Sequence, residues 1–295
     1  MGVSELKPRG TDSTNQNGKS GVVGLNRLIP NMMTLTAMAA GLAAIQFAWD
    51  NHWEKAVLAI VVAAILDSLD GATARLLKAT SEFGAQLDSL SDFLAFGVAP
   101  AVILYSWILE ESGKIGWIAM IVFAASSALR LARFNATQQK LPEWKKKFFS
   151  GIPAPAGAGL ALLPVMIWFQ LPDDFFSEVR FASPLVGLWT LLVAGMMVSR
   201  IPTFSTKMIR LPAKLGMPAL AFGALMIAAL FHAPWQTLTV FAFVYMGMIP
   251  FAVRKFRQMQ KEHEGVEEDI ADLAIGAISL DELNGTPSST QDKED

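Results

Sequence analysis

The sequence contains no cysteine and only three histidines among its 295 residues. Without cysteine there is no disulfide bond, no thiolate metal site and no cysteine nucleophile. The three histidines lie at the ends of apolar segments or in the C-terminal part, so we expect neither a histidine metal site nor a histidine base. Charged residues make up 17% of the chain, whereas soluble proteins carry about 25%. The composition therefore excludes an ordinary soluble domain.

Apolar residues are abundant instead, at 53% of the chain, and the mean hydropathy is +0.39. About 20 apolar residues are needed to cross a bilayer as a helix. Eight stretches approach that length, and we predict an all-α integral membrane protein with about eight transmembrane helices. Their predicted ranges are 30–49, 54–77, 84–109, 115–137, 152–171, 183–200, 215–232 and 235–253.

Positive charge predicts the orientation of these helices. If the N-terminus is cytoplasmic, all of the 24 lysine and arginine residues lie on the cytoplasmic side except Lys55, Lys114 and Arg180. Such a bias follows the positive-inside rule. Both termini are then cytoplasmic, and we expect the protein in a bacterial inner membrane with its active site at the cytoplasmic face.

The chain is predicted to divide into four parts. A polar segment covers residues 1–27, and a core of six spans covers 28–210. Two additional transmembrane helices follow at 211–257. The last part, 258–295, is strongly acidic and is predicted to be disordered.

The second and third predicted spans contain four aspartates. Insertion of an acidic residue at the centre of a membrane helix costs about 2.5–3.5 kcal/mol, so such residues are unusual in a span. Asp67 and Asp70 share one helix face by their spacing, and so do Asp88 and Asp92. The two spans form a hairpin, so the two acidic faces can meet near the cytoplasmic end. Four clustered carboxylates repel one another, and a divalent cation would remove that repulsion. Oxygen ligands favour a hard ion, which makes all four residues candidate metal ligands.

Small and basic residues surround these acids. Gly71, Ala74 and Gly84 permit close approach of a ligand or a neighbouring helix, and Arg75 carries a guanidinium that matches phosphate geometry. Mg²⁺ and Mn²⁺ commonly pair carboxylates with substrate phosphates. The pattern therefore indicates a diphosphate substrate at the membrane surface.

The full spacing is D-x2-D-G-x2-A-R-x8-G-x3-D-x3-D over residues 67–92. It resembles the CDP-alcohol phosphotransferase family at every position of that family's motif. The resemblance implies transfer of a phosphatidyl group from a CDP-linked donor to an alcohol, with release of CMP. It also implies Mg²⁺ or Mn²⁺ as two ions, the first three aspartates as ligands on the diphosphate, and Asp92 as general base.

Three further stretches bear on the alcohol: "ALRLARFNAT" at 128–137, "FFSGIPAPAGAG" at 148–159 and "SRIPTFSTK" at 199–207. They resemble the branch of the family that uses L-serine, which implies CDP-diacylglycerol as donor and phosphatidylserine as product. The basic residues match the serine carboxylate, although a glycerol phosphate acceptor would also use them. Positive-inside anchoring is the alternative explanation for the arginines. Candidate acceptor-binding residues are Arg130, Arg133, Asn135 and Lys207.

"PNMMTLT" at 30–36 resembles the family's first-span element and implies that Asn31 and Thr34 lie near the nucleotide, with an ordinary helix start as the alternative. Family membership further implies a homodimer, membrane lipid as partner and no nucleic acid. Two other hypotheses stay open. One is another acceptor, giving phosphatidylglycerol phosphate, phosphatidylinositol phosphate or phosphatidylcholine. The other is a cation transporter, which would place acids near mid-membrane on several spans.

Overall fold

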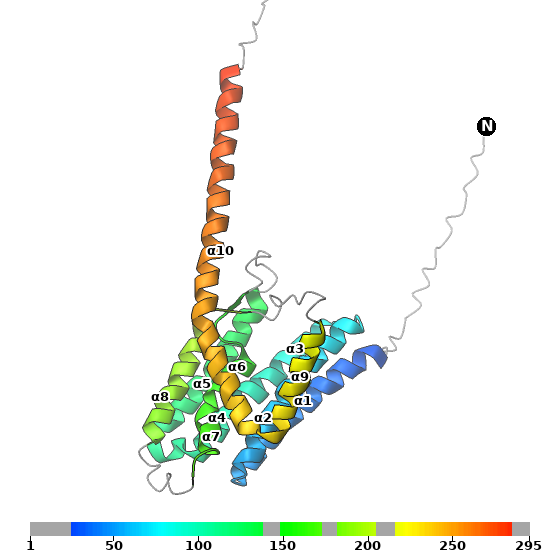
Figure 1. Ribbon diagram of the computed structural model, residues 1–295, viewed down its shortest axis with the longest axis vertical. Coiled ribbons are helices and arrows are strands. Elements are labelled where there is room, and N and C mark those ends of the chain that lie inside the picture. The colour runs from blue at the N-terminus through cyan, green and yellow to red at the C-terminus, as the bar shows by residue number, and fades with distance from the viewer. Residues whose placement is uncertain (1–24, 138–147, 173–181, 205–215, 285–295) are drawn as a thin grey trace, which may run out of the picture.

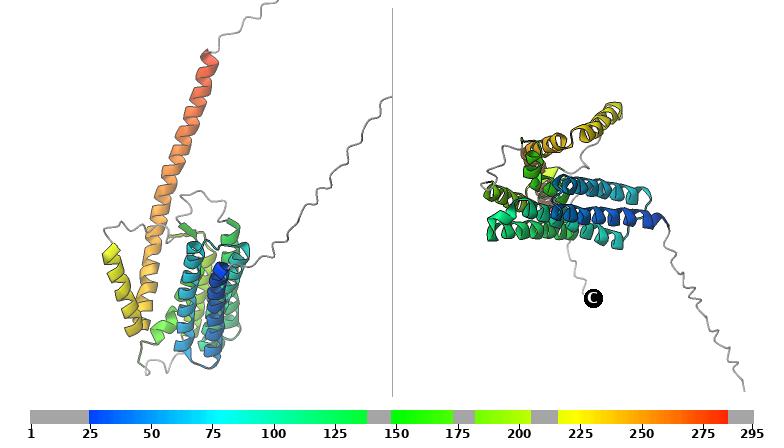
Figure 2. Two further views of the ribbon diagram at one scale, coloured as in Figure 1. Left: turned by 90° about the vertical axis from the view of Figure 1, so that its right-hand side faces the viewer. Right: turned by 90° about the horizontal axis from the view of Figure 1, so that it is seen from below.

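A computed structural model describes residues 25–137, 148–172, 182–204 and 216–284 of the chain, and it describes side chains only between Leu28 and Lys261. It is a bundle of antiparallel helices with one small sheet (Figures 1 and 2). The first half holds α1 (Leu25–Trp49), α2 (Trp53–Leu76), α3 (Glu82–Asp92), the π-helix η1 (Phe93–Val98), α4 (Ala99–Trp107), the short 3₁₀-helix η2 (Leu109–Ser112) and α5 (Lys114–Thr137).

The second half begins with strand β1 (Phe148–Ser150), followed by α6 (Ala154–Ala161) and α7 (Leu163–Trp168). Then come α8 (Ser183–Val198), β2 (Pro202–Phe204), α9 (Gly216–His232) and α10 (Pro234–Asn284). Strands β1 and β2 pair antiparallel, with Phe149 opposite Thr203. The start of α1 and the long free part of α10 lie at the same end of the bundle (Figure 1).

Five helical segments are long and apolar enough to cross a membrane: Leu28–Trp49, Trp53–Leu76, Glu82–Trp107, Lys114–Ala136 and Pro234–Lys261. Ser183–Val198 and Gly216–His232 are apolar but shorter. Large apolar side chains on the outside of these helices are exposed, for example Leu42, Leu58 and Ile118, as expected for a surface that faces lipid. The fold is therefore that of an all-α integral membrane protein, as predicted.

The predicted fifth span, 152–171, is two short helices that meet at Leu162. Proline has no N–H, so Pro164 cannot donate to the carbonyl of Leu160 four residues earlier. The indole N–H of Trp189 on α8 donates to that carbonyl instead, at 2.8 Å. A neighbouring helix thus satisfies the backbone group that proline leaves free, which membrane helices require.

The predicted third span also departs from a regular helix, because η1 begins directly after Asp92. A π-turn inside an α-helix is rare and occurs mostly at functional sites. A Cβ added at Gly97 in η1 would lie 2.9 Å from Cβ and Oγ of Ser127 on α5. The glycine therefore allows η1 and α5 to pack closely, one helical turn before Arg130.

Helix α10 differs most from the sequence prediction. It continues to Asn284 and has 51 residues, whereas the sequence predicts disorder from residue 258 onwards. Glutamate, alanine and leucine favour helix in this segment, and no proline follows Pro250 before Asn284. The final stretch, 285–295, lies outside the described residues.

Candidate active site: a carboxylate cluster between two helices

The two acidic faces meet at the end of the bundle where α2 ends and α3 begins. One carboxylate oxygen each from Asp67, Asp70 and Asp88 lies within 4.8 Å of the others. Asp70 is buried, with 4% of its surface exposed, and the other two are partly buried. Such a spacing suits simultaneous coordination of one ion, and an all-oxygen set suits Mg²⁺ or Mn²⁺. The residues present therefore fit a hard divalent cation.

Asp92 completes the cluster from the last position of α3. Its carboxyl group is in hydrogen-bonding contact with that of Asp67. Because η1 starts at the next residue, the backbone after Asp92 widens at this point. Asp92 is thus placed beside the three clustered acids and deeper in the bundle, where it is partly buried.

Thr34 holds one member of the cluster in place. Its hydroxyl donates to Oδ2 of Asp70 at 2.6 Å and also lies 3.1 Å from the Pro30 carbonyl. The Ser91 hydroxyl donates to the Thr34 carbonyl at 3.1 Å, which ties α3 to α1. A hydroxyl carries one proton, and the shorter distance indicates that Thr34 donates its hydrogen bond to Asp70. Thr34, expected near the nucleotide, therefore contacts a candidate metal ligand directly.

Asn31 and Gly84 lie next to each other. A Cβ at Gly84 would lie 3.2 Å from Oδ1 of Asn31 and 3.1 Å from Oγ of Ser81. The Ser81 hydroxyl accepts the Gly84 N–H at 3.0 Å and caps the start of α3. The glycine thus permits the N-terminal turn of α3 to approach α1.

Gly71, Ala74 and Arg75 continue α2 beyond the acids. A Cβ at Gly71 would meet only Nη1 of Arg75, at 3.7 Å. Gly71 and Ala74 are partly buried, whereas Arg75 is exposed. The backbone at Gly71 is therefore open on its outer side, and the guanidinium of Arg75 lies beside that opening.

The candidate acceptor residues separate in space. Arg130 is buried, with 7% of its surface exposed; it stacks over the Phe134 ring at 5.4 Å and lies within electrostatic reach of Asp92 and Asp67. Arg133 donates from Nη1 to the Val198 carbonyl at 2.6 Å and so secures the end of α8.

Asn135 donates to Oγ of Ser89 at 2.8 Å and joins α5 to α3. Lys207 lies outside the described residues. Arg130 thus has its charge within reach of the cluster, whereas Arg133 bonds to the end of α8 and Asn135 bonds to Ser89 on α3.

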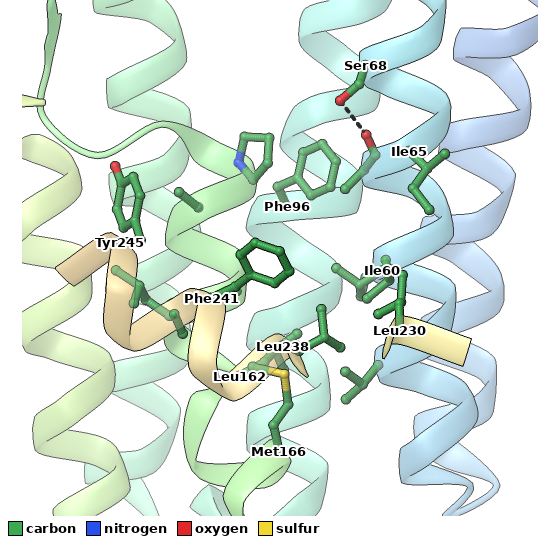
Figure 3. Close-up of a pocket in the computed structure, with 18 of the residues that line it drawn as sticks. Ile60, Ile65, Ser68, Phe96, Leu162, Met166, Leu230, Leu238, Phe241 and Tyr245 are labelled. Carbon is green, nitrogen blue, oxygen red and sulfur yellow. Dashed lines mark hydrogen bonds between the residues drawn. The ribbon is translucent and has the colours of Figure 1, made fainter. Parts of the chain in front are cut away.

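Beside the cluster is an apolar cavity of about 740 Å³. Figure 3 shows Ser68 at one end and Leu162 and Met166 at the other, with Phe96 between them. Ser68 and Leu69, which line this cavity, lie between Asp67 and Asp70 in the sequence and on another side of α2 than the face that the two acids share. Sequence reasoning missed the cavity, because residues from α2, η1, α6, α7, α9 and α10 line it and each resembles ordinary core. The small residues Ala64, Ala156 and Gly159 are the one feature of the sequence that could have indicated this cavity.

A family model described as CDP-alcohol phosphatidyltransferase matches residues 27–201, which contain all four aspartates. The chain belongs to this family. A second model, CDP-alcohol phosphatidyltransferase 2, matches residues 214–250, which include all of α9 and the first part of α10. The family matches thus extend over both the helices that carry the acids and the helices that close the cavity.

Curated relatives of this CDP-alcohol phosphatidyltransferase carry the name CDP-diacylglycerol–serine O-phosphatidyltransferase. The relative from Mycobacterium bovis is 36% identical over 260 residues, which cover 88% of this chain and 86% of the relative. The relative from Helicobacter pylori strain 26695 is 35% identical over 222 residues, or 74% and 88% of the two chains. The relative from Bacillus subtilis is 39% identical over 136 residues, or 46% and 74%.

Proposed function

We propose that this protein transfers the phosphatidyl group of CDP-diacylglycerol to L-serine, which gives phosphatidylserine and CMP. The observation that carries the proposal is the carboxylate cluster, with Asp67, Asp70 and Asp88 within 4.8 Å, on a helix hairpin whose first helix, α2, also lines an apolar cavity. A nucleotide-activated lipid needs both a polar site for its diphosphate and an apolar site for its chains. The names of the bacterial relatives support CDP-diacylglycerol as donor and serine as acceptor.

The cavity would hold acyl chains of the donor. Its volume of about 740 Å³ falls in the range of roughly 300–1,000 Å³ typical of ligand sites. Its lining is apolar from Leu69 to Met166, and burial of each methylene there contributes about 0.8 kcal/mol. The diphosphate would then lie at the Ser68 end, beside Asp67 and Asp70 and within reach of Arg75.

Mg²⁺ or Mn²⁺, as two ions, would be held by Asp67, Asp70, Asp88 and Asp92. Bound there, the metal would neutralise the diphosphate and make CMP a better leaving group. Thr34 orients Asp70 through its hydrogen bond. The exposed guanidinium of Arg75 adds a bidentate donor for a phosphate oxygen, and Asn31 and Gly84 form the neighbouring surface for the nucleotide.

In the reaction, the serine hydroxyl oxygen forms a bond to the phosphorus that carries diacylglycerol. The bond from this phosphorus to the bridging oxygen breaks, and that oxygen leaves with CMP. The proton of the serine hydroxyl passes to the carboxylate of Asp92, which acts as general base. Arg130 would pair with the serine carboxylate, since its buried charge favours an anionic ligand. Lys207, Arg133 and Asn135 would contribute at the edge of this acceptor site.

We place this site at the cytoplasmic face of a bacterial inner membrane, in a homodimer whose subunits each have eight transmembrane helices. Five long apolar helices, two shorter ones and the broken pair α6–α7 together would supply these eight crossings. Residues 28–210 would then form the catalytic core, with 211–257 as two further spans. The positive-inside bias of the sequence supports this orientation.

Purified protein in detergent should release CMP from CDP-diacylglycerol and L-serine when Mg²⁺ or Mn²⁺ is present. Asp92→Asn should lower turnover by at least about 100-fold, the typical minimum for a general base, while the fold stays intact. Reaction with glycerol 3-phosphate but not with serine would contradict the acceptor assignment. Full turnover by Asp92→Asn would contradict the role of Asp92, and cation flux in proteoliposomes without CMP release would favour a transporter.

A further inference from the structure

The hydroxyl of Tyr245 is a buried polar group that the assigned site does not use. Tyr245 lies in the first half of α10, and its ring packs against the hydrophobic core. Within the described part of the chain, its hydroxyl is buried and has no hydrogen-bond partner. The nearby Thr203 hydroxyl donates to the Gly151 carbonyl at 2.9 Å and makes no hydrogen bond of ordinary geometry with the phenol. A buried hydroxyl without a partner costs about 1–3 kcal/mol, so this position requires an explanation.

The direction of this side chain points to the reaction site. Tyr245 lines the apolar cavity, and Figure 3 shows its hydroxyl directed toward the end where Ser68 lies, away from Leu162 and Met166. That end adjoins Asp67 and Asp70 on α2. The phenol therefore presents a hydrogen-bond donor at the polar end of an otherwise apolar space.

Arg130 shares this location. Its guanidinium is buried and lies within electrostatic reach of both Tyr245 and Asp92. Arg133, one turn later, is already bonded to the Val198 carbonyl. A single buried guanidinium next to a neutral O–H donor matches a ligand with one negative charge and two oxygen atoms, because each oxygen then receives a donor.

We propose that Tyr245 is a specificity residue for the acceptor: its hydroxyl donates a hydrogen bond to the carboxylate of L-serine while Arg130 pairs with the same carboxylate. The inference rests on the function proposed above and adds a residue from α10, outside the motif of four aspartates. Held by these two donors, the serine hydroxyl lies within reach of Asp92, since Asp92 and Tyr245 are both close to Arg130. Acceptors without a carboxylate lose both contacts.

Tyr245→Phe tests this proposal, since it removes one oxygen atom and keeps the ring. A hydrogen bond to a charged group contributes about 1.5–3 kcal/mol, so we expect the KM for serine to rise at least about tenfold. The kcat, the KM for CDP-diacylglycerol and the melting temperature should stay unchanged. The preference for serine over ethanolamine, which has no carboxylate, should fall by the same factor as the KM for serine rises.

Tyr105→Phe is the matched control, because Tyr105 is the other tyrosine of the chain and stacks edge-on against Trp117 at 5.4 Å. We expect wild-type kinetics from it. An unchanged KM for serine in Tyr245→Phe would overturn the inference alone. A raised KM for CDP-diacylglycerol with an unchanged KM for serine would assign the hydroxyl to the lipid phosphate and overturn it as well. A wild-type enzyme that does not use serine would instead overturn the proposed function.

Discussion

The hydrogen bond between Thr34 and Asp70 gives the sharpest test of how the cluster is held. Both residues are buried, with 5% and 4% of their surfaces exposed, and the Oγ1–Oδ2 distance is 2.6 Å. Thr34→Val keeps the size and the β-branch of the side chain but removes the donor. Asp70 then keeps its burial and loses the contact that fixes the orientation of its carboxylate.

The expected loss follows from the charge of the acceptor. A hydrogen bond to a charged group contributes about 1.5–3 kcal/mol, which corresponds to roughly 10- to 150-fold in affinity. Loss of a partner that orients a metal ligand typically lowers metal affinity about 10- to 100-fold. We therefore expect the Mn²⁺ concentration for half-maximal CMP release to rise at least tenfold in Thr34→Val.

Two further variants make the experiment decisive. Thr34→Ser restores the hydroxyl and should come within about threefold of wild type, well below the effect of a lost charged hydrogen bond. Thr36→Val removes a hydroxyl two residues away that donates at 2.8 Å to the Met32 carbonyl and faces outward, so its Mn²⁺ dependence should not change. Isothermal titration with Mn²⁺ alone should rank the Mn²⁺ affinities of these variants in the same order as the activity assay. Equal Mn²⁺ affinity in Thr34→Val and wild type would refute the reasoning.

Two further predictions concern packing. Gly97→Ala places a Cβ 2.9 Å from Ser127 and should destabilise the protein by about 1–3 kcal/mol, which thermal unfolding in detergent measures. Gly195→Ala is the control, because nothing lies within 4 Å of its new Cβ, and it should leave the stability unchanged. Gly159→Leu also meets nothing within 4 Å at its Cβ, but it enters the cavity. It should raise the KM for CDP-diacylglycerol severalfold without lowering the melting temperature, and Gly195→Leu should leave that KM unchanged. A Gly159→Leu enzyme with wild-type lipid kinetics would argue against acyl chains in the cavity.

Local patterns in the sequence predict the helices and the meeting of the acidic faces. The length of an apolar run fixes α1, α2 and α5 to within a few residues, because a span must match the bilayer. Spacings of three and four place Asp67 beside Asp70 and Asp88 beside Asp92, and a hairpin of two adjacent helices then brings the pairs together. None of these steps requires a contact between distant parts of the chain.

Distant contacts are what the sequence leaves open. Thr34 and Asp70 are 36 positions apart, and the sequence patterns of their two helices do not indicate a hydrogen bond between them. The π-helix after Asp92 depends on how η1 packs against Ser127. Arg130 and Arg133 are both arginines of the "ALRLARFNAT" stretch. Arg133 nevertheless donates to the Val198 carbonyl at the end of α8, whereas Arg130 lies near the acids. Tertiary packing, which a single sequence does not display, decides each of these roles.

The last two helices line the cavity together with the helices of the core. Leu230 on α9 and four residues of α10 form one wall of the cavity: Leu238, Phe241, Ala242 and Tyr245.

Contacts at both ends fix this wall in place. Before the wall, at the start of α10, Trp235 packs against Phe169 with ring centroids 4.4 Å apart; after it, Phe256 meets Phe148 edge-on at 5.2 Å. Phe148 belongs to the β1–β2 pair that also contains Thr203. A helix held on both sides of this wall keeps Tyr245 in place within reach of Arg130. The predicted division between a catalytic core and two added spans, drawn at residue 210, therefore separates sequence segments but not the walls of the cavity.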